Sequence, residues 1–258
     1  MSALQGLLKK DYGISKFWFL FWLGFIAVFL IVPLLMELYF KQPASFLPIA
    51  VVMLLGSHAF FLPGMLLSML HLEGKTQLWL YNPQSSKSLL VSKVVVCLVY
   101  QLIAQVFLTG AGLTVYQFNK HQFFIETSDL IIGITVLNVG LLLFALYVSC
   151  WTIFYWSVYH YLGKFLAIKN WRWLALLLLF FLSNVIFTFL TKIAVLKEIV
   201  TKWKIPVLMG ANFEYKQGGW EIYLNGTDLP VLLLLLHALF AFCLFLISCW
   251  LLDRKVEV

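Results

Sequence analysis

The residues of this chain that are suited to chemistry lie mainly in one polar segment, Leu72 to Lys87, between two long apolar stretches. The segment opens with Glu73, Lys75 and Thr76, so that a carboxylate, an ammonium group and a hydroxyl lie within one helical turn. Such groups accept and donate hydrogen bonds to a partner. The segment is therefore the first candidate for a functional site.

The motifs of several enzyme classes are absent from the sequence. There is no GxxxxGK[ST] loop to hold ATP phosphates, no HExxH and no GxSxG. The four cysteines lie inside apolar stretches and form no CxxC pair. They are typical of small packing residues and predict neither zinc nor a disulfide framework. We therefore predict no catalytic residue, no metal site and no cofactor within this chain.

Ionisable residues are scarce inside the apolar stretches. The eleven acidic residues fall in loops or near the ends of the stretches, which leaves His58 and His237 as the exceptions. An ion-driven carrier usually keeps ionisable groups near the middle of the membrane. Each histidine could relay protons or satisfy a polar contact between helices, and the second role is the commoner one.

The composition predicts an integral membrane protein with an all-α fold. Hydrophobic residues make up 63% of the chain and charged residues 11%, and the mean hydropathy is +0.96. A helix needs roughly 20 apolar residues to cross a bilayer. We expect a single membrane domain, residues 1–258, with six spans near Phe17–Met36, Phe46–Leu70, Leu89–Val115, Leu130–Tyr155, Trp173–Leu190 and Leu229–Trp250.

The basic residues predict the orientation. With both termini in the cytoplasm, the inner side carries eleven Lys and Arg residues, and the short outer loops carry Lys41 and Lys120. Five more lysines lie in the long segment after the fifth span, where this rule is weak. The net charge of +7 is then mainly a topology signal, with attraction to anionic lipid as a second role, and it does not indicate nucleic-acid binding.

Residues 1–16 precede the first span. Leu4, Leu7, Leu8 and Tyr12 share one helical face while Lys9 and Lys10 point elsewhere, a pattern typical of a helix that lies in the membrane interface. A frayed basic tail is the alternative.

The polar segment itself predicts a short helix parallel to the membrane surface. Leu72, Thr76, Trp79 and Leu80 would face one side, with Glu73, Lys75 and Gln77 toward water. Asn82-Pro83 would end this helix, and Ser85 or Ser86 would cap the next one. An ordinary amphipathic connector explains the same pattern.

The order of residues in this segment resembles a known family. Glu73-Gly74-Lys75-Thr76, then Leu80, Pro83, a small polar pair and Lys93 are similar to the loop between the second and third spans of type-2 ABC exporter permeases. The six spans, the interfacial helix and the inside termini are also similar, so the resemblance covers nearly the whole chain.

The resemblance implies that the chain is one permease half in the plasma membrane. It would pair with a second permease subunit, identical or different, and dock a separate ATP-binding cassette subunit that holds ATP and Mg. The coupling loop, residues 71–88, carries the implied docking residues Leu72, Glu73, Gly74, Lys75, Thr76, Leu80 and Pro83. A lesser contact is implied in the second inner loop, at Lys164 and Lys169.

Residues 192–228 would pack over the outer mouth of the pathway in such a permease. Leu196, Ile199, Val200 and Trp203 lie on one face at helical spacing and form the expected gate, while a solvated loop resting on headgroups is the alternative. Pro206 and a Gly218-Gly219 turn follow.

An aromatic content of 17% suits a hydrophobic or amphipathic cargo such as a peptide, a toxin or an antimicrobial. The resemblance therefore implies an exporter of such cargo and a role in peptide transport or antimicrobial resistance. An ion-coupled carrier and a non-transporting immunity or assembly protein are the alternatives.

Overall fold

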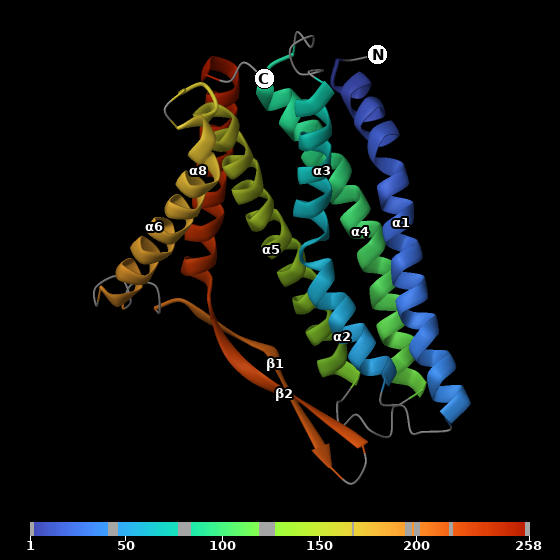
Figure 1. Ribbon diagram of the computed structural model, residues 1–258. Coiled ribbons are helices and arrows are strands. Elements are labelled where there is room, and N and C mark those ends of the chain that lie inside the picture. The colour runs from blue at the N-terminus through green and yellow to red at the C-terminus, as the bar shows by residue number, and fades with distance from the viewer. Residues whose placement is uncertain are drawn as a thin grey trace.

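The computed structural model describes residues 3–40, 46–76, 84–118, 127–166, 168–193, 198, 202–216 and 219–255. Long helices dominate it, as Figure 1 shows. The helices are α1 (Ala3–Phe40), α2 (Phe46–His58), α3 (Phe61–Thr76), α4 (Ser86–Phe118), α5 (Thr127–Leu162), the short 3-10 helix η2 (Lys169–Trp171), α6 (Arg172–Lys192) and α8 (Val231–Lys255).

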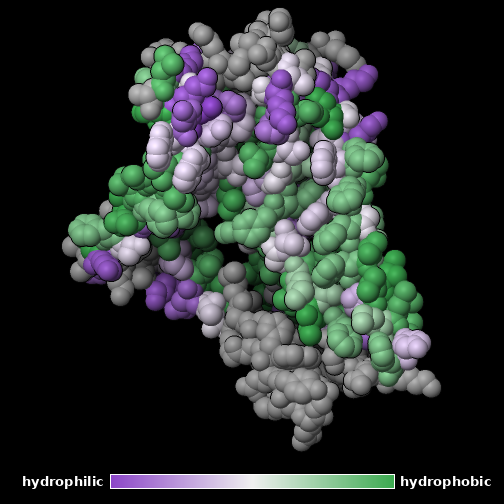
Figure 2. Space-filling view, in the orientation of Figure 1, coloured by the Kyte–Doolittle hydropathy of each residue, from purple (hydrophilic) through white to green (hydrophobic). Residues whose placement is uncertain are grey.

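Five of these helices, α1, α4, α5, α6 and α8, are long and apolar enough to cross a membrane. The bent pair α2–α3 raises the number to six when it is counted as one span. Figure 2 shows apolar residues over much of the visible flank, with hydrophilic residues gathered mainly toward the end that carries the termini. The prediction of a helical, multi-pass membrane protein is confirmed.

The start of the chain differs from the prediction. The interfacial helix expected over residues 1–16 is instead the first part of α1, which runs without a break from Ala3 to Phe40. The reason is a stripe of buried residues that crosses the expected boundary at helical spacing, namely Leu7, Asp11, Ser15, Phe19 and Ile26. Of the face that was expected to be apolar, Leu4 and Tyr12 are exposed.

The second span is broken at Ala59 and Phe60, where α2 and α3 meet at an angle of 44°. Pro63 explains the position of this break. Proline has no N–H to donate and its ring clashes with the carbonyl four residues earlier, which here is that of Ala59.

The segment before α8 folds as an antiparallel hairpin of β1 (Lys204–Lys216) and β2 (Gly219–Pro230), which the sequence analysis did not predict. The register runs from Lys204 opposite Pro230 to Lys216 opposite Gly219, with an irregularity between Leu208 and Gly210. β1 contacts α5, and the hairpin lies at the end of the bundle opposite the chain termini (Figure 1). β1 ends at Lys216 and β2 begins at Gly219, while Gly218 of the predicted Gly218-Gly219 turn lies outside the described residues.

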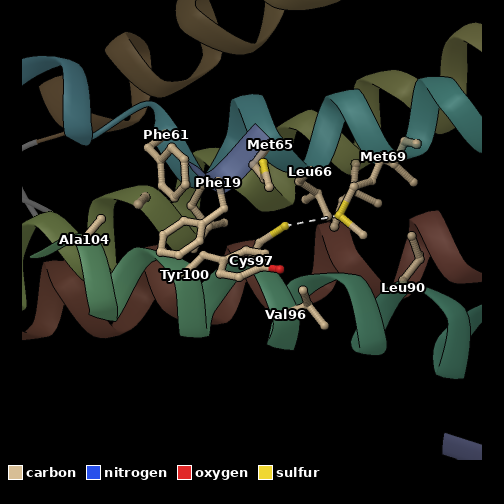
Figure 3. Close-up of a cluster of buried hydrophobic side chains, with 14 of the residues drawn as sticks. Phe19, Phe61, Met65, Leu66, Met69, Leu90, Val96, Cys97, Tyr100 and Ala104 are labelled. Atoms are coloured by element: carbon tan, nitrogen blue, oxygen red, sulfur yellow. Dashed lines mark hydrogen bonds between the residues drawn. The ribbon is translucent and has the colours of Figure 1, made fainter. Parts of the chain in front are cut away.

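The core lies where α1, α3, α4 and α5 pack together. Leu62, Leu66 and Leu70 recur every four residues along α3 and are fully buried. In Figure 3 the rings of Phe19 and Tyr100 lie stacked, with centroids 4.2 Å apart, and the Cys97 thiol points at the sulfur of Met69, 3.5 Å away. This packing fixes α3 against α1 and α4 just before the polar segment begins.

Candidate functional site at the loop between α3 and α4

The residues at the start of the predicted docking segment, Leu72 to Thr76, form the last turns of α3. They continue the second span rather than beginning a separate helix. Leu80 and Pro83 lie outside the described residues. The structure therefore describes the two sides of this loop, residues 72–76 and 84–93.

The predicted orientation of these residues is wrong for Glu73. Glu73 is only 2% exposed although water contact was expected, whereas Leu72 is 43% exposed. Because α3 is continuous, its helical phase carries over from the core: Glu73 follows Leu66, Met69 and Leu70 on the buried face. His71, Leu72, Lys75 and Thr76 remain on the exposed side.

Glu73 belongs to a buried charge cluster, which we define as Lys10, Asp11, Glu73 and Lys93. The ammonium group of Lys93 lies 2.9 Å from Glu73 Oε2 and 3.2 Å from Asp11 Oδ1. Lys10 lies 2.5 Å from Glu73 Oε1 and 3.6 Å from Asp11 Oδ1. Two ammonium groups thus face two carboxylates, and the cluster joins α1, α3 and α4.

Burial makes this cluster depend on complete pairing. Asp11 and Lys93 are fully buried, and the Ser92 hydroxyl donates a further hydrogen bond of 2.5 Å to Asp11 Oδ2. Charges removed from water are tolerated only when partners and hydrogen bonds compensate them, and removing one partner typically costs about 3–5 kcal/mol. Each carboxylate therefore pairs with both ammonium groups, and loss of either carboxylate leaves both lysines with one partner.

Gly74 is a point of close approach between α3 and α5. A Cβ added there would lie 3.3 Å from the ring of Trp156 and 3.7 Å from that of His160. The ring of Trp156 would have to move by a few tenths of an ångström to make room for that atom, so glycine favours this close approach of the two helices. Gly74 therefore has a packing role in this structure.

The far side of the loop is tied to the last helix of the chain. Ser85 occupies the N-cap of α4, since its carbonyl accepts from Leu89 N–H at 3.2 Å, in accord with the predicted capping by Ser85 or Ser86. The carboxylate of Asp253 in α8 accepts a hydrogen bond of 2.9 Å from Ser86 N–H. A carboxylate is favourable there, since helix N-termini carry partial positive charge.

The remaining predicted contacts are separate from this site. Lys164 and Lys169 are exposed in the connection between α5 and α6. Trp203, from the expected gate, is exposed at the base of the hairpin, and its carbonyl accepts from Val231 N–H at 3.1 Å. Leu196, Ile199 and Val200 lie outside the described residues.

The two histidines of the spans differ. His237 bonds through Nδ1 to the carbonyl of Leu233 at 2.8 Å, which is a contact within its own helix. His58 is fully buried at the end of α2 and its ring lies parallel to that of Phe61, with centroids 5.8 Å apart. Within the described part of the chain, no three His, Cys, Asp or Glu residues are grouped to hold a metal ion.

The helices and this site indicate the class of protein. The chain is a multi-pass membrane protein whose helices are joined at one end by buried ion pairs. Its sequence is 31% identical to the uncharacterized protein YhcE of Bacillus subtilis strain 168, over an alignment of 269 residues that covers 100% of both chains. The chain belongs to the same family as YhcE. No protein-family profile and no solved structure matches it.

Proposed function

We propose that the chain is the permease subunit of an ATP-driven exporter in the plasma membrane, with six spans and both termini in the cytoplasm. A separate ATP-binding cassette subunit would hold ATP and Mg, and a second permease subunit would complete the pathway. The cargo would be hydrophobic or amphipathic, such as a peptide, a toxin or an antimicrobial. This proposal rests on the resemblance of the loop between α3 and α4 to the corresponding loop of type-2 ABC exporter permeases. The contacts that anchor this loop to the neighbouring helices support it.

The observation that best supports the proposal is the anchoring of this loop on both sides. Before the loop, the charge cluster ties Glu73 to α1 and α4, and Gly74 packs against α5. After it, Asp253 of α8 holds the first residue of α4. A displacement of the loop would therefore act on four helices besides α3, as a coupling element between an ATPase and a transport pathway requires.

The roles of the docking residues divide accordingly. We assign contact with the ATP-binding subunit to the exposed side of the helix end, Leu72, Lys75 and Thr76. Glu73 and Gly74 support that surface from within. Leu80 and Pro83 would continue it as the coupling helix.

The hairpin and the segment before it would form the outer gate. The proposed gate residues Leu196, Ile199, Val200 and Trp203 precede β1, and the hairpin lies at the end of the bundle opposite the termini (Figure 1). A segment that covers the outer mouth of the transport pathway must lie at the end of the bundle away from the cytoplasm, which is where the proposed orientation puts the hairpin.

Thr76→Trp tests the docking surface. The large ring would stand on the proposed contact surface, where a clash that costs ~1.4 kcal/mol lowers the affinity about tenfold. We expect the ATP-binding subunit, identified by its mass and its P-loop, to co-purify with the variant at about a tenth of the wild-type yield. The matched control is Thr114→Trp, an exposed threonine of α4 toward the other end of the bundle.

Normal co-purification and transport by Thr76→Trp would show that the loop does not dock the ATPase. Transport into vesicles separates the remaining alternatives. An ion-coupled carrier would move cargo without the ATP-binding subunit, and an immunity or assembly protein would bind its partner without moving cargo at all.

A further inference from the structure

The connection between α5 and α6 combines positive charge with exposed apolar side chains. Gly163 to Trp173 includes three basic residues, Lys164, Lys169 and Arg172, and contains no acidic residue. Leu166 is 93% exposed, Trp171 60% and Trp173 61%. A surface so apolar is costly in water, at roughly 25 cal/mol for each Å² of apolar area. Its large side chains therefore point to a partner that takes up apolar groups.

The connection has a defined local structure. Lys169 N–H donates to the carbonyl of Phe165 at 2.9 Å, and Trp171 N–H donates to that of Ile168 at 2.8 Å. Arg172 is held by two further contacts: its Nε donates to the carbonyl of Lys169 at 2.9 Å, and its guanidinium lies 4.6 Å from the ring centroid of Tyr159. The basic groups are thus presented from an ordered turn.

Glycine at position 163 makes room for this arrangement. A Cβ there would lie 2.7 Å from a terminal nitrogen of Arg172. The guanidinium therefore packs directly over the backbone at the end of α5, beside the base of the turn that carries Lys164.

The location of the turn decides which partner fits it. It joins two helices that are apolar enough to span a membrane, and it lies at the end of the bundle that carries both termini (Figure 1). The turn is therefore at a membrane boundary. At that depth tryptophan and leucine side chains enter the boundary between the headgroups and the lipid chains, and lysine and arginine reach phosphate groups.

We propose that Lys164, Lys169 and Arg172 bind the phosphate of an anionic lipid headgroup, while Leu166, Trp171 and Trp173 insert among the lipid chains beneath it. Each basic side chain near an anionic surface strengthens binding about fivefold. The site does not depend on the proposed transport function. It gives Lys164 and Lys169 a lipid partner in place of the ATP-binding subunit that the resemblance implied.

Lipid binding by the purified full chain tests the site. Nanodiscs of phosphatidylcholine would receive increasing phosphatidylglycerol, with binding followed by native mass spectrometry. We expect Lys164→Gln/Lys169→Gln to weaken phosphatidylglycerol binding about 25-fold and to leave phosphatidylcholine binding unchanged. The matched control is Lys9→Gln/Lys16→Gln, two exposed lysines of α1 with the same loss of charge. Inorganic phosphate added at millimolar concentration should compete weakly, since it offers no chains to the apolar side chains.

A second measurement reports on the inserted rings. Phosphatidylglycerol brominated near the top of its chains should quench less fluorescence in Trp171→Phe/Trp173→Phe than in wild type, by more than the loss of two of the ten tryptophans explains. An unchanged melting temperature in neutral lipid would show that each variant is folded.

Three results would overturn the site. Equal losses in the α1 control would indicate general basicity, and equal binding of neutral and anionic lipid would exclude the phosphate contact. A double variant that keeps lipid binding but loses the ATP-binding subunit would assign the turn to that protein.

Discussion

At the residue scale, Glu73 shows how the phase of one helix decides what a charged side chain does. Its neighbours Leu72 and Lys75 are exposed, whereas Glu73 lies between two ammonium groups at 2.5 and 2.9 Å. The buried cluster holds four formal charges that compensate one another, so its members act as a unit. Substitution of one member should therefore affect stability first and partner binding only as a consequence.

Glu73→Gln should lower the free energy of unfolding by about 3–5 kcal/mol, because it leaves the fully buried Lys93 and the partly exposed Lys10 with one carboxylate between them. The measurement is the unfolding temperature of the purified chain in detergent, compared with Lys75→Gln, a neighbouring exposed change that should have little effect. Glu73→Gln/Lys93→Met restores charge balance and should recover most of the loss. Equal effects of Glu73→Gln and Lys75→Gln would contradict the cluster.

Gly74→Leu should lower the free energy of unfolding by about 1–3 kcal/mol, because the added side chain overpacks against Trp156. The control is Gly64→Leu in the same helix, where an added Cβ has no atom within 4 Å. Combining Gly74→Leu with Trp156→Ala should recover part of the loss, and a double-mutant cycle on unfolding temperatures measures this coupling. Purely additive losses would mean that the two residues do not meet.

At the element scale, the sequence predicts what is local and misses what depends on distant partners. The spans follow from length and hydropathy alone, and each predicted span overlaps a long helix or the bent pair α2–α3. The helix ends differ, since α1 begins at Ala3 rather than Phe17 and α5 ends at Leu162 rather than Tyr155. The charge cluster joins residues as far as 82 positions apart, which no spacing rule connects. A local signal did exist: Lys93 lies among Leu89, Leu90, Val96 and Cys97 on one helical face, which indicates burial.

The hairpin was missed for a related reason. Trp220, Ile222 and Leu224 alternate with Glu221, Tyr223 and Asn225 after a double glycine, a period-two pattern typical of a strand after a turn. The prediction for the residues before this turn rested on helical spacing alone. The prediction of a separate N-terminal helix differs from the continuous helix α1. The sequence becomes more apolar near Phe17, but this change in composition does not break the helix backbone.

Asp253→Asn tests the link between α8 and the start of α4. The change removes a charge that favours the helix N-terminus and weakens the cap, at a cost of about 0.5–2 kcal/mol. We expect faster amide hydrogen exchange at Ser86 to Leu90 and little change elsewhere in α4. The control, Asp129→Asn, alters an acidic residue in the first turn of α5 and should leave the exchange of these amides unchanged. Unaltered exchange in Asp253→Asn would show that the cap does not hold α4.

At the scale of the whole molecule, the bundle has two different ends. One carries both termini, the charge cluster and the connection between α5 and α6, and the other carries the hairpin (Figure 1). The proposed orientation places the first end in the cytoplasm, because basic residues concentrate in its short loops. The docking proposal depends on which end faces inward.

Cysteine labelling decides the orientation. In a chain whose four native cysteines are replaced by serine or alanine, Lys75→Cys places a thiol on the proposed docking surface, and Thr227→Cys places one in the hairpin. Both positions are exposed, so accessibility differs only by the side of the membrane. We expect a membrane-impermeant maleimide to label Thr227→Cys in intact cells and Lys75→Cys only after the cells are opened. The reverse pattern would place the docking surface outside, where no ATP-binding subunit could reach it.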